Sequence, residues 1–231
     1  MPVTHVGSST AGANTATIAP AWPAGTASGD VAYLFWVMVN TATPNVPTGF
    51  TQVAANDMNG SGRTRIYRKV LSATESGSLT LSNTTSLANR QSAVLTVYRG
   101  VLNSTPEDST PSFRSESVAG TTHANPSETT TVAGCVIVTS VFERSTTGTN
   151  AWTPPSGYVE RGDTLALAVG SGGTITAVAD DLASKAIGTY TPGVWTSGNG
   201  FSTINVSTYT MALREAPAAT GMVEHVGIIP I

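Results

Sequence analysis

Short apolar runs separated by Gly, Pro, Asn and Ser are the feature that most limits how this chain can fold. The runs have the length of strands rather than helices, and they recur along most of the 231 residues. Short strands at regular spacing with turn residues between them are typical of β-sandwiches and barrels. Only residues 180–186 have the pattern of a short helix, which Gly188 would end. The pattern predicts an all-β, jelly-roll-like antiparallel sandwich of about eleven strands with almost no helix.

The strands can be placed from the apolar runs and the turns between them. Val31–Val39 is apolar on both alternating faces, which predicts a central strand covered on both sides. Asn59–Gly62 has the composition of a tight hairpin turn. The expected strands are 15–19, 31–39, 50–54, 64–70, 78–81, 92–98, 135–142, 158–160, 165–169, 175–179 and 209–213.

Two parts of the chain echo each other. Gly29 leads into the strand 31–39 and is followed by the turn Pro47-Thr-Gly-Phe50, while Gly134 leads into the strand 135–142 and is followed by Pro155-Ser-Gly-Tyr158. An internal duplication and the reuse of similar turns by similar hairpins both explain this. We expect an N-terminal arm at 1–14, one sandwich domain at 15–215 with the polar stretch 105–125 as a surface loop, and a linker with an apolar tail at 216–231.

Composition limits the classes of partner. Charged residues make up 11% of the chain, against about 25% in ordinary domains, and the net charge is −3. The 11 Lys and Arg residues are scattered, so no basic stripe predicts nucleic-acid binding. No apolar run is long enough to span a membrane, and the start of the chain lacks the pattern of a signal peptide, which predicts synthesis in a cytoplasm.

The chain offers few groups for chemistry. Cys135 is the single cysteine, and its apolar run predicts a buried thiol rather than a reactive one. The three histidines have no metal-ligand spacing, and no Gly-x-Ser-x-Gly elbow is present. Asp180-Asp181 and Arg161-Gly-Asp163 are interpreted as turns. We expect no catalytic residues, no metal and no cofactor.

Two tryptophans are candidates for stacking on sugars. Trp152 and Trp195 lie in stretches rich in Thr, Pro and Gly, where a ring could be exposed, whereas Trp36 belongs to the buried strand. A loop tryptophan can also cap the open end of a sandwich. A glycan site at Trp152 and Trp195 is therefore one of two interpretations.

The two ends of the chain suggest docking to a partner. The phrase His5-Val-Gly7 recurs as His225-Val-Gly227, and the last residues are more apolar than a solvated tail should be. The tail either pairs with its own domain or adds as a strand to a neighbouring subunit. The candidate docking residues are His5, Val6, Met222, Val223, His225, Val226, Ile228, Ile229 and Ile231.

The order of motifs resembles a family of β-sandwich proteins from tailed bacteriophages, especially those of actinobacteria, that serve as minor tail or capsid decoration proteins. The matching segments span most of residues 15–214. They are 24–30 before the first long strand, Pro47–Phe50, Tyr67–Val70, Ser92–Gly100, Trp152 with Pro155–Tyr158, and Tyr209–Arg214. The apolar tail and the His-Val-Gly phrases are not part of this pattern, and the resemblance implies no catalytic residues.

Three functions follow as expectations. The first is a non-enzymatic virion structural protein that docks through its termini to other tail or capsid subunits in several copies. The second is a carbohydrate-binding module that recognises host glycans through Trp152 and Trp195. The third is a hydrolase on a sandwich scaffold, which would need a metal ion or a pair of buried carboxylates in a cleft.

Overall fold

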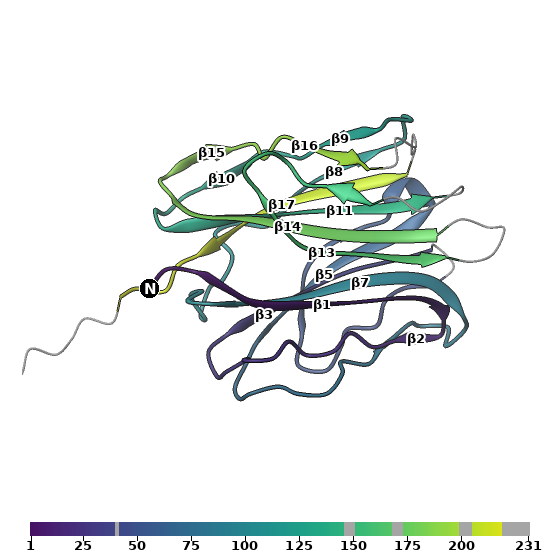
Figure 1. Ribbon diagram of the computed structural model, residues 1–231, viewed down its shortest axis with the longest axis horizontal. Helices are drawn as coiled ribbons and strands as arrows, with labels where there is room; N and C mark the ends of the chain where they lie inside the picture. The colour runs from purple at the N-terminus through teal and green to yellow at the C-terminus, as the bar shows by residue number, and fades with distance from the viewer. Residues whose placement is uncertain (40–41, 146–150, 168–172, 199–204, 219–231) are drawn as a thin grey trace, which may run out of the picture.

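The computed structural model describes residues 1–39, 42–145, 151–167, 173–198 and 205–218. These residues are nearly all β, and every pairing between strands is antiparallel, which confirms the all-β sandwich. Two five-stranded sheets lie face to face, and smaller sheets lie outside them (Figure 1). Met58–Gly60, called η1, is one turn of 3-10 helix, placed where the sequence predicted a hairpin turn.

The ten longer strands make up the two large sheets. The first sheet has the order β1-β7-β3-β5-β4 and the second has the order β13-β14-β11-β17-β8. The strands of the first sheet are β1 (Thr4–Thr15), β3 (Val31–Val39), β4 (Thr51–Asn56), β5 (Gly62–Val70) and β7 (Asn89–Arg99). Those of the second are β8 (Ser112–Glu116), β11 (Cys135–Ser145), β13 (Val159–Leu167), β14 (Gly173–Lys185) and β17 (Val206–Arg214).

Seven short strands form the outer layers, so the described residues contain more strands than the sequence predicted. One outer sheet pairs β2 with β6, a second pairs β10 with β15, and a third has the order β12-β16-β9. Their bounds are β2 (Thr17–Ile18), β6 (Leu81–Ser82), β9 (Thr122–Ala124), β10 (Glu128–Thr130), β12 (Trp152–Thr153), β15 (Gly188–Tyr190) and β16 (Val194–Ser197). Strands of two to four residues carry too little alternation to be recognised from a sequence.

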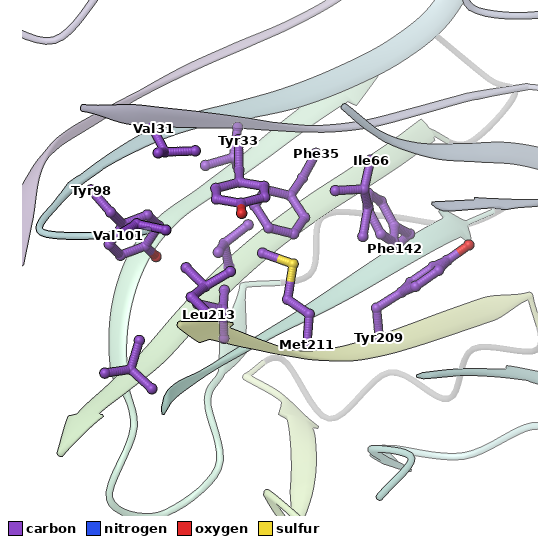
Figure 2. Close-up of a cluster of buried hydrophobic side chains, with 14 of the residues drawn as sticks. Val31, Tyr33, Phe35, Ile66, Tyr98, Val101, Phe142, Tyr209, Met211 and Leu213 are labelled. Atoms are coloured by element: carbon purple, nitrogen blue, oxygen red, sulfur yellow. The ribbon is translucent and has the colours of Figure 1, made fainter. Parts of the chain in front are cut away.

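The outer layers explain why the central strands are apolar on both faces. The main core lies between the two large sheets, where Tyr33, Phe35 and Ile66 meet Phe142 and Tyr209 (Figure 2). A second core lies on the other face of the first sheet, and a third lies on the other face of the second sheet. All of β3 is buried, which confirms the prediction of a strand covered on both sides.

The two halves of the chain have the same topology. If β1, β3, β4, β5 and β7 are matched in chain order with β8, β11, β13, β14 and β17, the spatial orders of the two large sheets become identical. The echoing turns also match: the amide of Phe50 donates to the carbonyl of Pro47, and the amide of Tyr158 donates to that of Pro155. Gly49 and Gly157 take positive φ in these turns, at +80° and +85°. This agreement favours the internal duplication over the chance reuse of hairpins.

A matching irregularity supports the duplication. An extra residue, Val53, interrupts the pairing of β4 with β5, and Arg161 interrupts the pairing of β13 with β14 at the corresponding place. Bulges depend on local geometry and are kept within families as structural features.

We call residues 1–100 the first half, residues 101–218 the second half, and the surface between their large sheets the seam.

Three predictions about segments were wrong. Residues 1–14 are not an arm, because Thr4–Thr15 pairs with β7 from end to end except for a bulge at Val6. Residues 180–186 are not a helix, because Asp180 to Lys185 continue β14, where pairing with β11 outweighs weak helical propensity. The stretch 105–125 is not a plain loop, because it contains β8 and β9.

The seam is closed along one side by two edge strands. β1 of the first half packs against β13 of the second half, and a Cβ atom placed on Gly12 would lie 2.4 Å from the carbonyl oxygen of Leu165. A Cβ on Gly162 would lie 3.2 Å from the side chain of Thr10. Glycine is therefore required at Gly12 for the backbones of the two halves to approach this closely.

Candidate functional site

A cluster of mostly buried side chains that includes an ion pair lies in the seam, near its closed side. Asp180 on β14 is fully buried, and its Oδ2 accepts hydrogen bonds from the hydroxyl of Tyr98 at 3.0 Å and from Nε of Arg161 at 2.8 Å. The second carboxylate oxygen, Oδ1, is buried without a hydrogen-bond partner. Burial and the nearby Asp180 raise the pKa of Tyr98 well above its usual range, so the phenol stays neutral and donates. We call Tyr98, Arg161 and Asp180 the Asp180 cluster.

His5 lies at the edge of the Asp180 cluster. Its ring meets the Tyr98 ring edge-on at 5.7 Å, and its Nε2 lies 2.7 Å from the hydroxyl of Ser8. Burial and the charge of Arg161 lower the pKa of His5, so the ring is neutral near pH 7. The hydrogen bond from Tyr98 on β7 to Asp180 on β14 ties the first half to the second, whereas Arg161 pairs with Asp180 within the second half.

A related cluster occupies the corresponding place on the other side of the seam. The hydroxyl of Tyr33 donates to Oε1 of Glu107 at 2.7 Å, and the guanidinium of Arg68 pairs with Oε2 of the same carboxylate. Just before β8, Glu107 forms an isolated β-bridge with Leu213 of β17. His5 of β1 pairs with Tyr98 of β7 in the corresponding position of the first half. A pocket of about 240 Å³ opens beside Arg68 and Glu107, with Gln52 and Val53 in its wall.

A third group of acids lies on the second large sheet, beneath the outer layer of the second half. Glu143 is fully buried and accepts a hydrogen bond from Nε1 of Trp152 at 3.1 Å. The carboxylate of Asp163 accepts the backbone amide of Trp152 at 2.9 Å. His123 contacts Glu116 at 2.5 Å, and its ring meets the Trp152 ring edge-on at 5.5 Å. These acids hold the short strand β12 against the sheet.

Asp163 carries a testable pH dependence. Burial raises the pKa of its carboxyl to about 6, although the amides of Trp152 and Thr164 oppose the shift. Between pH 4 and pH 6, roughly, the folded chain holds this proton and the unfolded chain does not, so stability falls as the pH rises through that window. We expect Asp163→Asn to remove this slope and to raise the free energy of unfolding at pH 7 by about 1–3 kcal/mol. Urea unfolding at several pH values measures both effects.

The matched control for Asp163→Asn is Asp57→Asn, which changes an exposed carboxylate on the connection between β4 and β5. The control should keep the slope between pH 4 and pH 6. An unchanged slope in Asp163→Asn would contradict the assignment.

The two tryptophans proposed to stack on sugars are buried. Trp152 is 2% exposed and Trp195 is fully buried, and both belong to the core under the outer layer. Their Nε1 atoms donate to Glu143 and to Thr139, so the polar edges of both rings are used inside the chain. The prediction of exposed rings was wrong, because β12 and β16 pair with each other and cover the sheet where the sequence suggested open loops.

The candidate docking residues fall into two groups. His5 and Val6 lie in β1, where both are half-buried, and Val6 packs against the core on the outer face of the first sheet. Met222, Val223, His225, Val226, Ile228, Ile229 and Ile231 lie outside the described residues. His5 and Val6 are thus part of the fold rather than a free docking arm.

The remaining sequence candidates are structural parts of the sheets. Cys135 is buried, as its apolar run predicted. Burial is the largest cause that raises the pKa of its thiol to about 11. Arg161-Gly-Asp163 and Asp180-Asp181 are not turns, because both lie within strands. Arg161, Asp163 and Asp180 belong to the clusters above, whereas Asp181 pairs with Lys185. The signal that could have placed Asp180 correctly is the apolar run 175–179, which continues into it without a turn residue.

The described residues contain no group of three or more His, Cys, Asp and Glu side chains that could hold a metal ion. No helix in the described part of the chain is long and apolar enough to cross a membrane. Comparison with known proteins finds no matching family model, no matching curated protein and no matching solved structure.

Proposed function

We propose that the chain is a non-enzymatic structural protein of a phage particle, a minor tail or capsid decoration protein that docks through its termini. The observation that carries the proposal is the position of the two ends of the described chain. The N-terminal ammonium group donates to the carbonyl of Ala216 at 2.5 Å, so both ends meet at one end of the sandwich (Figure 1). A body with both ends at one point can be attached there and present the rest of its surface outward.

The hydrogen bonds and ion pairs of the buried acids support a structural role. Glu107 binds Arg68 and Tyr33 across the seam, and Asp180 accepts a hydrogen bond from Tyr98 across it. Arg161 pairs with Asp180 within the second half, and together these contacts rigidify the body. Most of the motif segments that resemble phage tail and decoration proteins lie in the large sheets and their turns, from Pro47–Phe50 to Tyr209–Arg214, and Trp152 lies in β12 of an outer sheet. A charge-poor, rigid module suits a protein displayed in many copies.

Particles made by the genome that encodes the chain test the proposal. Mass spectrometry of purified particles should detect the chain, and gold-labelled antibody should place it on the tail or the capsid. A chain without residues 219–231 should remain folded and be lost from the particles. The control Leu87→Ser alters an exposed side chain between β6 and β7 and should leave incorporation unchanged. Absence of the full chain from particles would reject the proposal.

A further inference from the structure

Residues 3–7, which lead into β1 and form its start, fill a well-defined slot at the edge of the first sheet. Val3 is 3% exposed and packs into the seam core together with Tyr98 and Val101. Two residues later, the ring of His5 lies edge-on to Tyr98. Thr4, between them, is exposed. The slot therefore selects the side chains at Val3 and His5 and leaves Thr4 free to vary.

The next two residues are also selected. Val6 is the extra residue of a bulge between the pairs His5–Tyr98 and Gly7–Val97, and it packs on the outer core. A Cβ atom on Gly7 would lie 2.9 Å from Cβ of Pro23, a separation that real Cβ atoms essentially never show. The slot thus selects the phrase Val-x-His-Val-Gly, and we call it the first-strand slot.

The same phrase occurs a second time, near the end of the chain. Val223-Glu-His-Val-Gly227 repeats Val3-Thr-His-Val-Gly7 at each selected position and differs only at the exposed one. The chain has three histidines, and two of them lie in this phrase. A match at all four positions that the slot selects, one of them the rare histidine, points to a shared binding site.

The second copy of the phrase begins within reach of the slot. The last described residue is Ala218, and Ala216 lies against Met1 at the entrance to the slot. Five residues lead from Ala218 to Val223, and an extended chain of that length spans up to about 17 Å. The tail of the same molecule can therefore enter the slot from the same end as the N-terminus.

We propose that Val223–Gly227 is a second occupant of the first-strand slot and exchanges there with Val3–Gly7 of the same molecule. When the tail is in the slot, residues 1–7 are released from the sheet and free to bind another subunit. This last step rests on the proposed docking through the termini, whereas the exchange itself does not. Two strands with the same selected residues compete for one position, so removal of one leaves the other to fill it.

A cycle of truncations tests the exchange. We expect removal of 219–231 to leave the thermal midpoint of the full chain unchanged. Removal of 1–7, with a new initiating Met before Ser8, should lower the midpoint only slightly, because the tail fills the vacant slot. Removal of both should lower the midpoint by roughly a further 5–10 °C. Equal midpoints for the chain without 1–7 and the chain without both segments would overturn the proposal.

If the chain that lacks both residues 1–7 and residues 219–231 does not fold, single substitutions in the chain without residues 1–7 test the exchange instead. Gly227→Val should lower the midpoint as the loss of the tail does, because a side chain there would meet Pro23 as one at Gly7 would. The control Glu224→Thr changes the exposed position to the residue found in β1 and should keep the midpoint. No effect of Gly227→Val would overturn the exchange.

The mass of the chain without residues 1–7, measured by light scattering, distinguishes the source of the tail. A monomer supports filling by the same molecule, and a concentration-dependent multimer would overturn that assignment in favour of a second copy. None of these measurements uses phage particles, so absence of the chain from particles and failure of the exchange would be told apart.

Discussion

Replacing Asp180 with Ala is expected to lower the free energy of unfolding by about 3–5 kcal/mol, because it breaks a buried ion pair from one side. Arg161 would keep its charge in a position where its side chain is 19% exposed, and the hydroxyl of Tyr98 would lose its acceptor. The hydrogen bond between Tyr98 and Asp180 crosses the seam, so its loss should weaken the attachment of the two halves. Guanidinium unfolding at pH 7 measures the change.

The neighbouring residue provides the matched control for Asp180→Ala. Asp181 is partly exposed and pairs with Lys185 on the same strand, so Asp181→Ala should cost no more than about 1 kcal/mol. The double change Asp180→Ala with Arg161→Leu should cost less than the sum of the two single changes, because no cation is left unpaired. Similar losses for Asp180→Ala and Asp181→Ala would contradict a structural role for the cluster.

Adding a single methyl group at Gly12 is expected to have an effect of similar size. In Gly12→Ala the new carbon would lie 2.4 Å from the backbone oxygen of Leu165, and backbone cannot rotate away as a side chain can. Either β1 or β13 must move, and the packing of the closed side of the seam must open. We expect a loss of about 3 kcal/mol, at the upper end of overpacking effects, measured by urea unfolding.

Gly188→Ala is the control for Gly12→Ala. Gly188 also lies in a strand, β15, but a Cβ atom there would meet only the Tyr190 ring at 3.9 Å, an ordinary contact. Its effect should stay within about 0.5 kcal/mol. If Gly12→Ala is as stable as the unaltered chain, the close approach of β1 and β13 does not hold the halves together.

The long strands could be predicted because their signal is local. Val31–Val39 and Cys135–Phe142 are apolar runs bounded by turn residues, and the structure contains β3 and β11 there. The echo between the Pro-x-Gly-aromatic turns also proved informative, since the two turns occupy matching places in two sheets of identical order. The short outer strands had no comparable signal, and their absence from the prediction made Trp152 and Trp195 look exposed.

By itself, the sequence determined the all-β class, the central buried strands and the repeated turns, because alternation, apolar run length and glycine placement act within a few residues. Only the tertiary structure decided that Asp180 lies in the seam with Arg161 and Tyr98, and that Gly12 faces the backbone of Leu165. The contacts of Asp180 with Tyr98 and of Gly12 with Leu165 join residues that are far apart in the chain, whereas Arg161 reaches Asp180 from the neighbouring strand. The first two contacts are set by how two sheets stack, and stacking leaves no periodic trace in a single strand.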